Sequence, residues 1–182
     1  MRPWLVWLIG VGLLAAAWVV VQVTPSDAEA ERPFAVAASE GKKTVARELV
    51  VTVSDPRVGD TAVDDRGWRA EGTWLVLDVV AEARVSEDGT LLGSVWLEVD
   101  GVRYRASERP LSMLGLAMDV GLPQAGSLAF DLPEELATGR GVVHIASVDE
   151  NRLDSVIEFP VDLAELERSA EVEVHGPERV RS

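Results

Sequence analysis

The sequence contains no cysteine, which excludes disulfide bonds, thiol catalysis and acylated-cysteine anchors. It has only two histidines, too few nitrogen ligands for an ordinary zinc site. Acidic residues outnumber basic ones 31 to 17, and the formal charge is −14. Because this charge repels nucleic acid and anionic lipid surfaces, we expect no nucleic-acid partner.

One long apolar segment opens the chain. Trp4–Val23 carries no charge and, at about 1.5 Å of helical rise per residue, is roughly 30 Å long, enough to cross a bilayer. Arg2 precedes the segment and acidic residues follow it, so the positive-inside rule predicts a cytoplasmic N-terminus. We therefore expect residues 1–23 to form a single-pass transmembrane signal-anchor, with the rest of the chain outside the cytoplasm.

A cleaved signal peptide is the alternative to a retained anchor. Ala28-Glu29-Ala30 has the small-x-small form of a signal-peptidase site, and cleavage after Ala30 would give a secreted protein. The apolar run is about 20 residues long, whereas the apolar part of a signal peptide usually has about 7 to 15. The length favours the anchor.

Composition divides the remaining chain into three parts. Residues 24–42 are rich in alanine, proline, serine and acids, which predicts a flexible tether in which only Phe34–Ala38 would dock locally. Residues 43–166 are enough for one domain with its own apolar core. Residues 167–182 are mostly charged and are predicted to be a C-terminal tail, with alternation confined to Glu171–His175.

Residues 43–166 alternate between apolar and polar side chains, which is typical of an antiparallel sheet. The clearest strand is 74–85, and the clearest hairpin is 95–106, where Asp100-Gly101 suits a type I′ turn. Pro133 is expected to end a strand, and Pro160 to mark an edge or a bulge. Further strands are expected at 48–54, 127–132, 142–148 and 156–161. About seven strands predict an all-β sandwich.

Three stretches resemble the bacterial extracytoplasmic immunoglobulin-like domains of unknown function, of the telokin-like, mycobacterial secreted-antigen type. They are Gly72-Thr73-Trp74-Leu75-Val76-Leu77-Asp78-Val79, the hairpin Val95–Tyr104, and the proline-glycine turn and strand Pro123–Pro133. The resemblance covers about Leu49 to Leu163. It implies an immunoglobulin-like antiparallel β-sandwich outside the cytoplasm, and it brings no catalytic residues.

Two apolar features are candidates for a partner surface. Residues 110–121 are apolar on nearly every side, which leaves a short helix and an extra strand both open. If the sheets leave Met113, Leu116 and Met118 uncovered, these side chains form an aliphatic patch for another chain; otherwise the segment caps the sandwich. Trp68, beside two arginines, is either an interface anchor or folds back over the core.

Two further tryptophans, Trp74 and Trp96, lie opposite the aliphatic faces of their strands. They either stack across one sheet or mark a binding face.

The sequence offers little material for catalysis or metal binding. His144 lies between Val143 and Ile145 and is expected to be a partly buried cross-strand residue, and His175 is expected to be solvated. A triad of His144 with Ser147 or Asp149 lacks a nucleophile elbow. The acidic stretches 60–65, 87–88 and 149–154 lack EF-hand spacing and are expected to be solvated turns. We expect no catalytic, metal-binding or cofactor-binding residue, and no enzyme.

These observations predict a membrane-anchored extracytoplasmic binding or assembly module of a bacterial cell envelope, with a protein partner. The near-absence of lysine is typical of a GC-rich bacterial genome. The alternative is a carrier of a small apolar or lipid ligand, with residues 110–121 as its lid.

Overall fold

The computed structural model describes Trp4, residues 10–14, Trp18 and residues 34–85, 90–147 and 155–180. The chain divides into two units, Met1–Arg32 and Pro33–Ser182. In the first unit the described residues are helical. A search of the described residues finds no helix with the length and apolarity to cross a membrane. Most of Trp4–Val23 lies outside the described residues, so the anchor stays a prediction.

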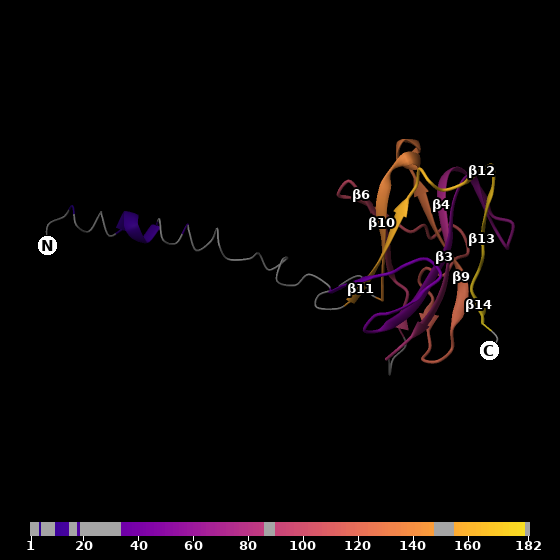
Figure 1. Cartoon of the computed structure of the whole chain (residues 1–182), viewed down its shortest axis with the longest axis horizontal. Helices are drawn as coiled ribbons and strands as arrows, with labels where there is room; N and C mark the ends of the chain where they lie inside the picture. Colours follow the sequence, from indigo (N-terminus) through magenta and orange to yellow (C-terminus); the bar gives the residue numbers. More distant parts are fainter. Residues whose placement is uncertain are drawn as a thin grey trace. The chain divides into compact units, whose positions relative to one another are not determined.

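The second unit is a β-sandwich, whose two layers Figure 1 shows. Its first sheet has the order β1-β11-β10-β6-β7. These strands are β1 (Phe34–Ala37), β6 (Ser94–Val99), β7 (Val102–Arg105), β10 (Arg140–Ala146) and β11 (Ser155–Asp162). Neighbouring strands are antiparallel, except that β1 runs parallel to β11.

The second sheet has the order β12-β3-β4-β9-β14, and β2 and β13 also pair with β3. Its strands are β2 (Lys43–Val45), β3 (Leu49–Asp64), β4 (Arg69–Ala83), β9 (Gln124–Leu132), β12 (Arg168–Ser169), β13 (Val172–Val174) and β14 (Glu178–Arg179). Two short strands, β5 (Thr90–Leu91) and β8 (Ala117–Met118), pair with each other, and η1 (Glu134–Thr138) is a 3-10 helix.

The main core lies between the two sheets. Its largest fully buried side chains include Leu75, Leu77, Leu97, Leu128 and Phe130. Side chains two positions apart on a strand point to the same face, so Leu75 and Leu77 of β4, and Leu128 and Phe130 of β9, all turn toward the other sheet. The expected all-β sandwich is therefore confirmed.

The expected turn signals also hold. Asp100 and Gly101 both have positive φ, at 50° and 78°, as a type I′ turn requires. Strand β9 ends immediately before Pro133. Pro160 lies within β11, but β1 pairs with β11 only as far as Glu158, whose carbonyl accepts the N–H of Ala38. Proline is tolerated here because β1 ends before reaching it.

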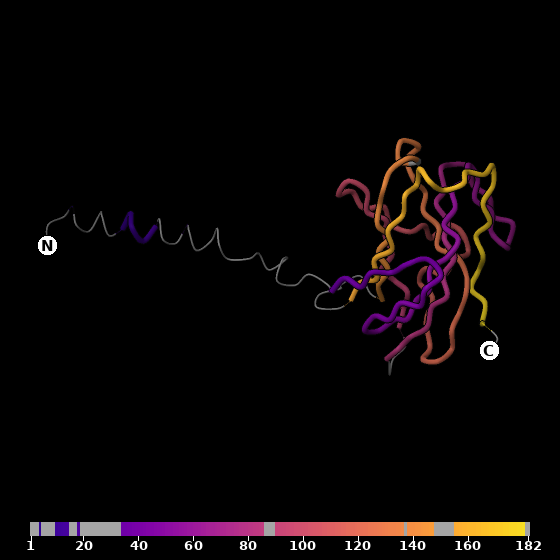
Figure 2. The backbone as a smooth tube through the Cα atoms, in the orientation of Figure 1, coloured from indigo at the N-terminus to yellow at the C-terminus, as the bar shows by residue number. Residues whose placement is uncertain are grey.

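A second, smaller core lies on the outer face of the second sheet. Trp74 and Val76 of β4 are fully buried there, beneath Val172 and Val174 of β13. We call residues 168–180 the C-terminal strap; Figure 2 shows this yellow segment running along the outside of the second layer. The strap adds a hydrophobic cover to a sheet whose inner face already packs in the sandwich.

The boundaries predicted for the domain need two corrections. Residues 167–182 are not simply a charged tail, because β12, β13 and β14 pair with the second sheet. Residues 24–42 are not a tether throughout, because β1, within the stretch Phe34–Ala38 for which local docking is expected, pairs with β11. In both places a few apolar side chains and backbone hydrogen bonds to distant strands outweigh the local composition.

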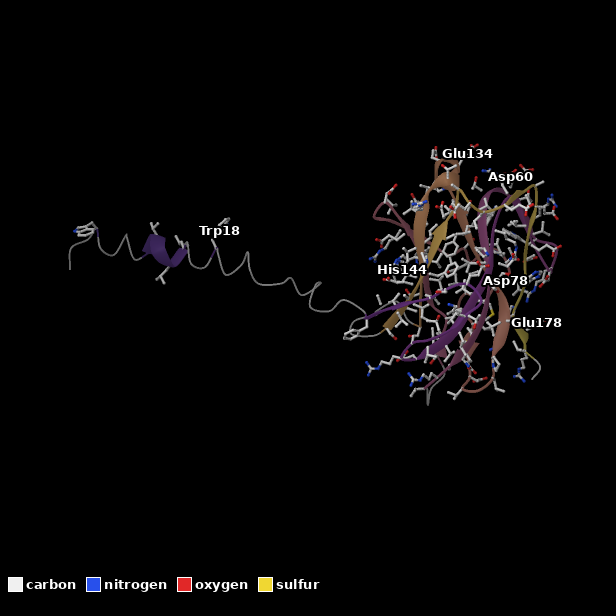
Figure 3. The ribbon with its side chains drawn as sticks, viewed as in Figure 1. Trp18, Asp60, Asp78, Glu134, His144 and Glu178 are labelled. Atoms are coloured by element: carbon white, nitrogen blue, oxygen red, sulfur yellow. The ribbon has the colours of Figure 1, made fainter. Side chains whose placement is uncertain are left out.

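A polar cluster fixes the strap to the sheet. The guanidinium of Arg57 donates from Nη2 to Asp78 Oδ1, at 3.0 Å, and to the carbonyl of Glu173, at 2.7 Å. Ser127 Oγ donates to the same Asp78 oxygen, at 2.6 Å, and accepts the N–H of His175, at 3.0 Å. Asp78 lies on the layer opposite His144 (Figure 3). The strap is therefore bound by both apolar burial and charge-assisted hydrogen bonds.

We expect Gly59→Ala to destabilise the domain through the strap. A Cβ at residue 59 would lie 2.7 Å from Val172 Cγ1, so that the strap must shift. Such overpacking costs about 1–3 kcal/mol. In a Val172→Ala background the same change should cost clearly less, because the clashing methyl group is gone. Urea unfolding of the wild type, both single variants and the double variant measures this coupling; strictly additive effects would contradict the packing described here.

Candidate binding groove

The structure does not expose the predicted aliphatic patch. Met113 and Met118 are fully buried in the main core, and Leu116 is partly buried against it. Residues 110–121 form mostly an irregular segment, with only Ala117–Met118 as a strand, and backbone hydrogen bonds to Leu92 and Ser127 hold it. Because Met113 and Met118 are buried in the core, the capping alternative is correct and the exposed patch is not.

An open groove of about 820 Å³ lies beside this segment. One wall is the turn between β3 and β4, and the other is the chain that follows β7. The groove is lined by Asp64, Arg66, Gly67, Trp68, Gly93, Glu108, Arg109, Pro110, Leu111, Ser112, Leu114 and Gly115. Of the four predicted surface residues, only Trp68 lines it.

Asp64 joins the two walls. Its Oδ1 accepts the N–H groups of Arg66, at 2.9 Å, and Trp68, at 2.8 Å, which closes the β3–β4 turn. Its Oδ2 accepts the N–H of Leu111 from the opposite wall, at 2.9 Å. Burial by itself would raise the pKa of Asp64, but these three N–H donors and the charge of Arg66 hold the pKa below the ordinary 3.8.

Trp68 meets the expectation that it folds back over the core. Its ring meets that of Trp74 edge to face, with centroids 5.6 Å apart, so it does fold back onto the small core. It also remains partly exposed in the groove. Arg109 lies over both rings, 5.4 and 5.5 Å from their centroids, and donates to Asp131 at 3.0 Å.

Arg66 differs from Arg109 in having a free guanidinium. Among the described residues it has neither an ion pair nor a side-chain hydrogen bond, and it is exposed. Both oxygens of neighbouring Asp64 are occupied by backbone donors. The groove therefore carries an exposed guanidinium without an ion pair next to a partly exposed indole, and the charge of this guanidinium acts on the neighbouring carboxylate of Asp64.

Trp96 and His144 lie away from the groove, on the outer face of the first sheet. Their rings stack 4.7 Å apart and nearly parallel, and Arg103 covers Trp96 at 5.3 Å. Trp74 belongs to the other sheet, so of the two alternatives the stacking of Trp74 on Trp96 is wrong. The expectation for His144 is confirmed: its side chain is 13% exposed and lies 3.7 Å from Glu158.

Burial lowers the pKa of His144 below 6.5, against the opposing effect of Glu158 and Glu98. Ser147, considered above as a triad partner and disfavoured, donates its hydroxyl to Glu48, at 2.7 Å. Asp149 lies outside the described residues.

The acidic turns serve the fold where they are described. Asp60, at the end of the sandwich that also carries Glu134 (Figure 3), pairs with Arg168 at 2.6 Å. Asp65 accepts the N–H of Gly176, at 2.7 Å, and lies 3.8 Å from partly exposed His175. The described residues contain no group of three or more His, Asp or Glu side chains arranged to hold a metal ion. The stretches 87–88 and 149–154 lie outside the described residues.

Fold and geometry define an all-β sandwich protein with a surface groove. No protein-family model matches the chain, and no curated protein matches its sequence. The crystal structure of an uncharacterized β-sandwich protein from Clostridium difficile 630 is similar, with a TM-score of 0.50 and 10% sequence identity. The match covers 76% of this chain and 100% of the other. At this identity the likeness shows the fold alone.

We expect Asp64→Asn to open the turn and destabilise the domain by about 2 kcal/mol, because an amide nitrogen cannot accept the third N–H. The native carboxylate has a lowered pKa, so its contribution is present above pH 3.8 and is lost as the pH falls through the lowered value. The stability difference between wild type and variant should therefore shrink in acid. Chemical unfolding at pH 7 and pH 3 measures it; an equal difference at both pH values would contradict this account.

For His144→Gln we expect a change in how stability depends on pH near neutrality, rather than in acid. The unfolded chain takes up a proton on His144 near pH 6.5, whereas burial opposes protonation in the native state. Wild-type stability should therefore fall between about pH 7.5 and 5 more steeply than that of the variant. His175 is present in both proteins and cancels in the comparison. Parallel stability curves across this range would show that His144 is not held neutral.

Proposed function

We propose that the protein is a non-catalytic, membrane-anchored extracytoplasmic module of a bacterial cell envelope that binds a protein partner through the groove. The observation that carries this proposal is the pairing of partly exposed Trp68 with the unpaired guanidinium of Arg66 in one open groove. Tryptophan and arginine are the residues most enriched at binding hot spots. The groove volume also falls within the range of about 300–1,000 Å³ that is typical of ligand sites.

The proposed location comes from the N-terminal sequence. The uncharged run Trp4–Val23, with Arg2 before it and the acidic segment after it, supports an anchor with its domain outside the cytoplasm. Cleavage after Ala30 is the alternative and would release the same domain. N-terminal sequencing of the mature protein distinguishes the two: an intact N-terminus supports the anchor, and a new one at Glu31 supports secretion.

We also propose that the sandwich is of the immunoglobulin-like, telokin type. The three stretches that carry the resemblance occupy structurally central positions: Gly72–Val79 lies in β4, Val95–Tyr104 spans the β6–β7 hairpin, and Pro123–Pro133 covers β9. These strands pair with their neighbours within the two sheets, and their side chains contribute to the core. Membership of this type would imply the fold and an extracytoplasmic location, but it would not imply an activity.

The carrier alternative has less support than the binding module. A lid over an apolar ligand requires space beneath residues 110–121, and Met113 and Met118 fill the core there with no exposed surface. The groove beside the segment is open and lined by charged as well as apolar residues. These features suit a protein surface better than an enclosed lipid.

Site-specific photocrosslinking in intact cells tests the proposal. A benzoylphenylalanine at Glu108, an exposed groove position, should give a discrete protein adduct, whereas one at Arg103 on the outer face of the first sheet should not. Trp68→Ala should reduce the Glu108 adduct about tenfold or more, as for a hot-spot residue. Trp96→Ala is the matched control and should leave it intact. No adduct, or one indifferent to Trp68, would contradict the proposal.

A further inference from the structure

We propose that Arg109 is a positioning residue of the groove: its guanidinium, held by Asp131, fixes the indole of Trp68 in the orientation that meets a partner. This inference rests on the proposed function, in which Trp68 is the contact residue, and it adds the residue that sets the orientation of that contact. Arg109 acts through Trp68 rather than through a contact of its own with the partner.

The backbone of Trp68 is fixed, but its side chain needs separate support. Its N–H donates to Asp64 Oδ1, at 2.8 Å, and its carbonyl accepts the N–H of Asp64, at 3.0 Å. These hydrogen bonds constrain the main chain and leave the side-chain torsions of the indole free to change rotamer. The orientation of the ring is therefore set by the side chains that pack against it.

Two side chains contact the ring of Trp68 from different directions. The fully buried ring of Trp74 meets it edge to face, at 5.6 Å between centroids and an interplanar angle of 86°. The guanidinium of Arg109 lies 5.4 Å from the centroid of Trp68 and 5.5 Å from that of Trp74, which is within the range of cation–π contacts. Arg109 therefore bridges the exposed indole and the buried one.

Arg109 is itself held in place by its surroundings. Its Nη1 donates to Asp131 Oδ2 in β9, at 3.0 Å. Two residues earlier, the N–H of Ser107 donates to the carbonyl of Ala129 in β9, at 2.7 Å. Two residues later, the N–H of Leu111 donates to the β3–β4 turn, at 2.9 Å. The main chain is thus fixed on both sides of Arg109, and the guanidinium is paired.

Fixing the indole matters for binding because a side chain that is already ordered loses less freedom when a partner docks. Trp68 and Arg109 both line the groove, whereas Asp131 is not among its lining residues. We therefore expect Asp131 to affect binding only by holding Arg109. This separates positioning of the indole from direct contact between the arginine and a partner.

The first sheet carries a similar arrangement away from the groove. Arg103 lies over Trp96, at 5.3 Å from the ring centroid, and donates to Glu98, at 3.1 Å. None of these three residues lines the groove. Arg103 is therefore a matched control, because it combines the same aromatic and carboxylate contacts at a different surface.

Fluorine NMR tests whether Arg109 fixes the ring. The full-length chain is labelled with 5-fluorotryptophan and purified in a mild detergent, and Trp68→Phe and Trp96→Phe assign the two resonances. Arg109→Gln and Asp131→Ala should each shift or broaden the Trp68 resonance and leave that of Trp96 unchanged, whereas Arg103→Gln should do the reverse. A Trp68 resonance that neither Arg109→Gln nor Asp131→Ala alters would overturn the inference.

The photocrosslink from residue 108 tests the consequence for binding. Arg109→Gln and Asp131→Ala should each reduce the protein adduct about threefold or more, and Arg103→Gln should leave it intact. In a Trp68→Ala background, Arg109→Gln should cause no further loss, because the arginine acts through the indole that is no longer present.

The outcomes separate this inference from the proposed function. An adduct that Trp68→Ala weakens and Arg109→Gln does not overturns the inference and leaves the function standing. An equal loss from Arg109→Gln with and without the indole shows direct contact between the arginine and the partner, and also overturns the inference. A wild-type chain that gives no adduct overturns both.

Discussion

The burial of β4 on both faces is the constraint from which the rest of the structure follows. Leu75 and Leu77 point into the sandwich, whereas Trp74 and Val76 point the other way and are equally buried. An antiparallel sheet usually leaves one face to solvent. Here the chain must supply a cover for the second face.

The C-terminal strap and the end of the β3–β4 hairpin provide that cover together. Strand β3 has irregular pairing at two places, between Ser54 and Arg57 and between Gly59 and Thr61, and such irregularities bend a strand. The end of the hairpin then contributes Ala62, Ala70 and Trp68 to the small core. Asp64, at the end of the same hairpin, accepts the N–H of Leu111. The hairpin end that covers the outer face of β4 therefore also forms one wall of the groove.

Local pattern predicted the parts of this fold that depend on neighbouring residues. Alternation located the main strands, Asp100-Gly101 located a turn, and Pro133 located a strand end. The small core was missed because it joins β4 to β13, about a hundred residues later, and no local rule specifies that contact. A signal was present, since Glu171–His175 alternates within a charged segment. For β1 the sequence indicated only local docking of Phe34–Ala38, because a four-residue parallel pairing depends on the distant strand β11.

In the groove, too, features that depend on neighbouring residues were predictable and contacts between distant residues were not. That Trp68 lies beside arginines was visible in the sequence, but which arginine would stack on it was not. Arg109 is the one that does, although it lies 41 positions later, and Arg69 pairs with the strap instead. The apolar composition around Met113 and Met118 indicated that these side chains are buried, but it did not indicate which strands they pack against.

Long-range packing also determines which acidic side chains are occupied by backbone donors. The acids beside Arg66 were recruited by backbone donors of Leu111 and Gly176, which arrive only when the chain has folded. The arrangement of Arg66 and Trp68 in the groove therefore depends on contacts that only the folded chain makes. Binding through this groove, as proposed above, would require correct folding of the strap and of the segment around Leu111.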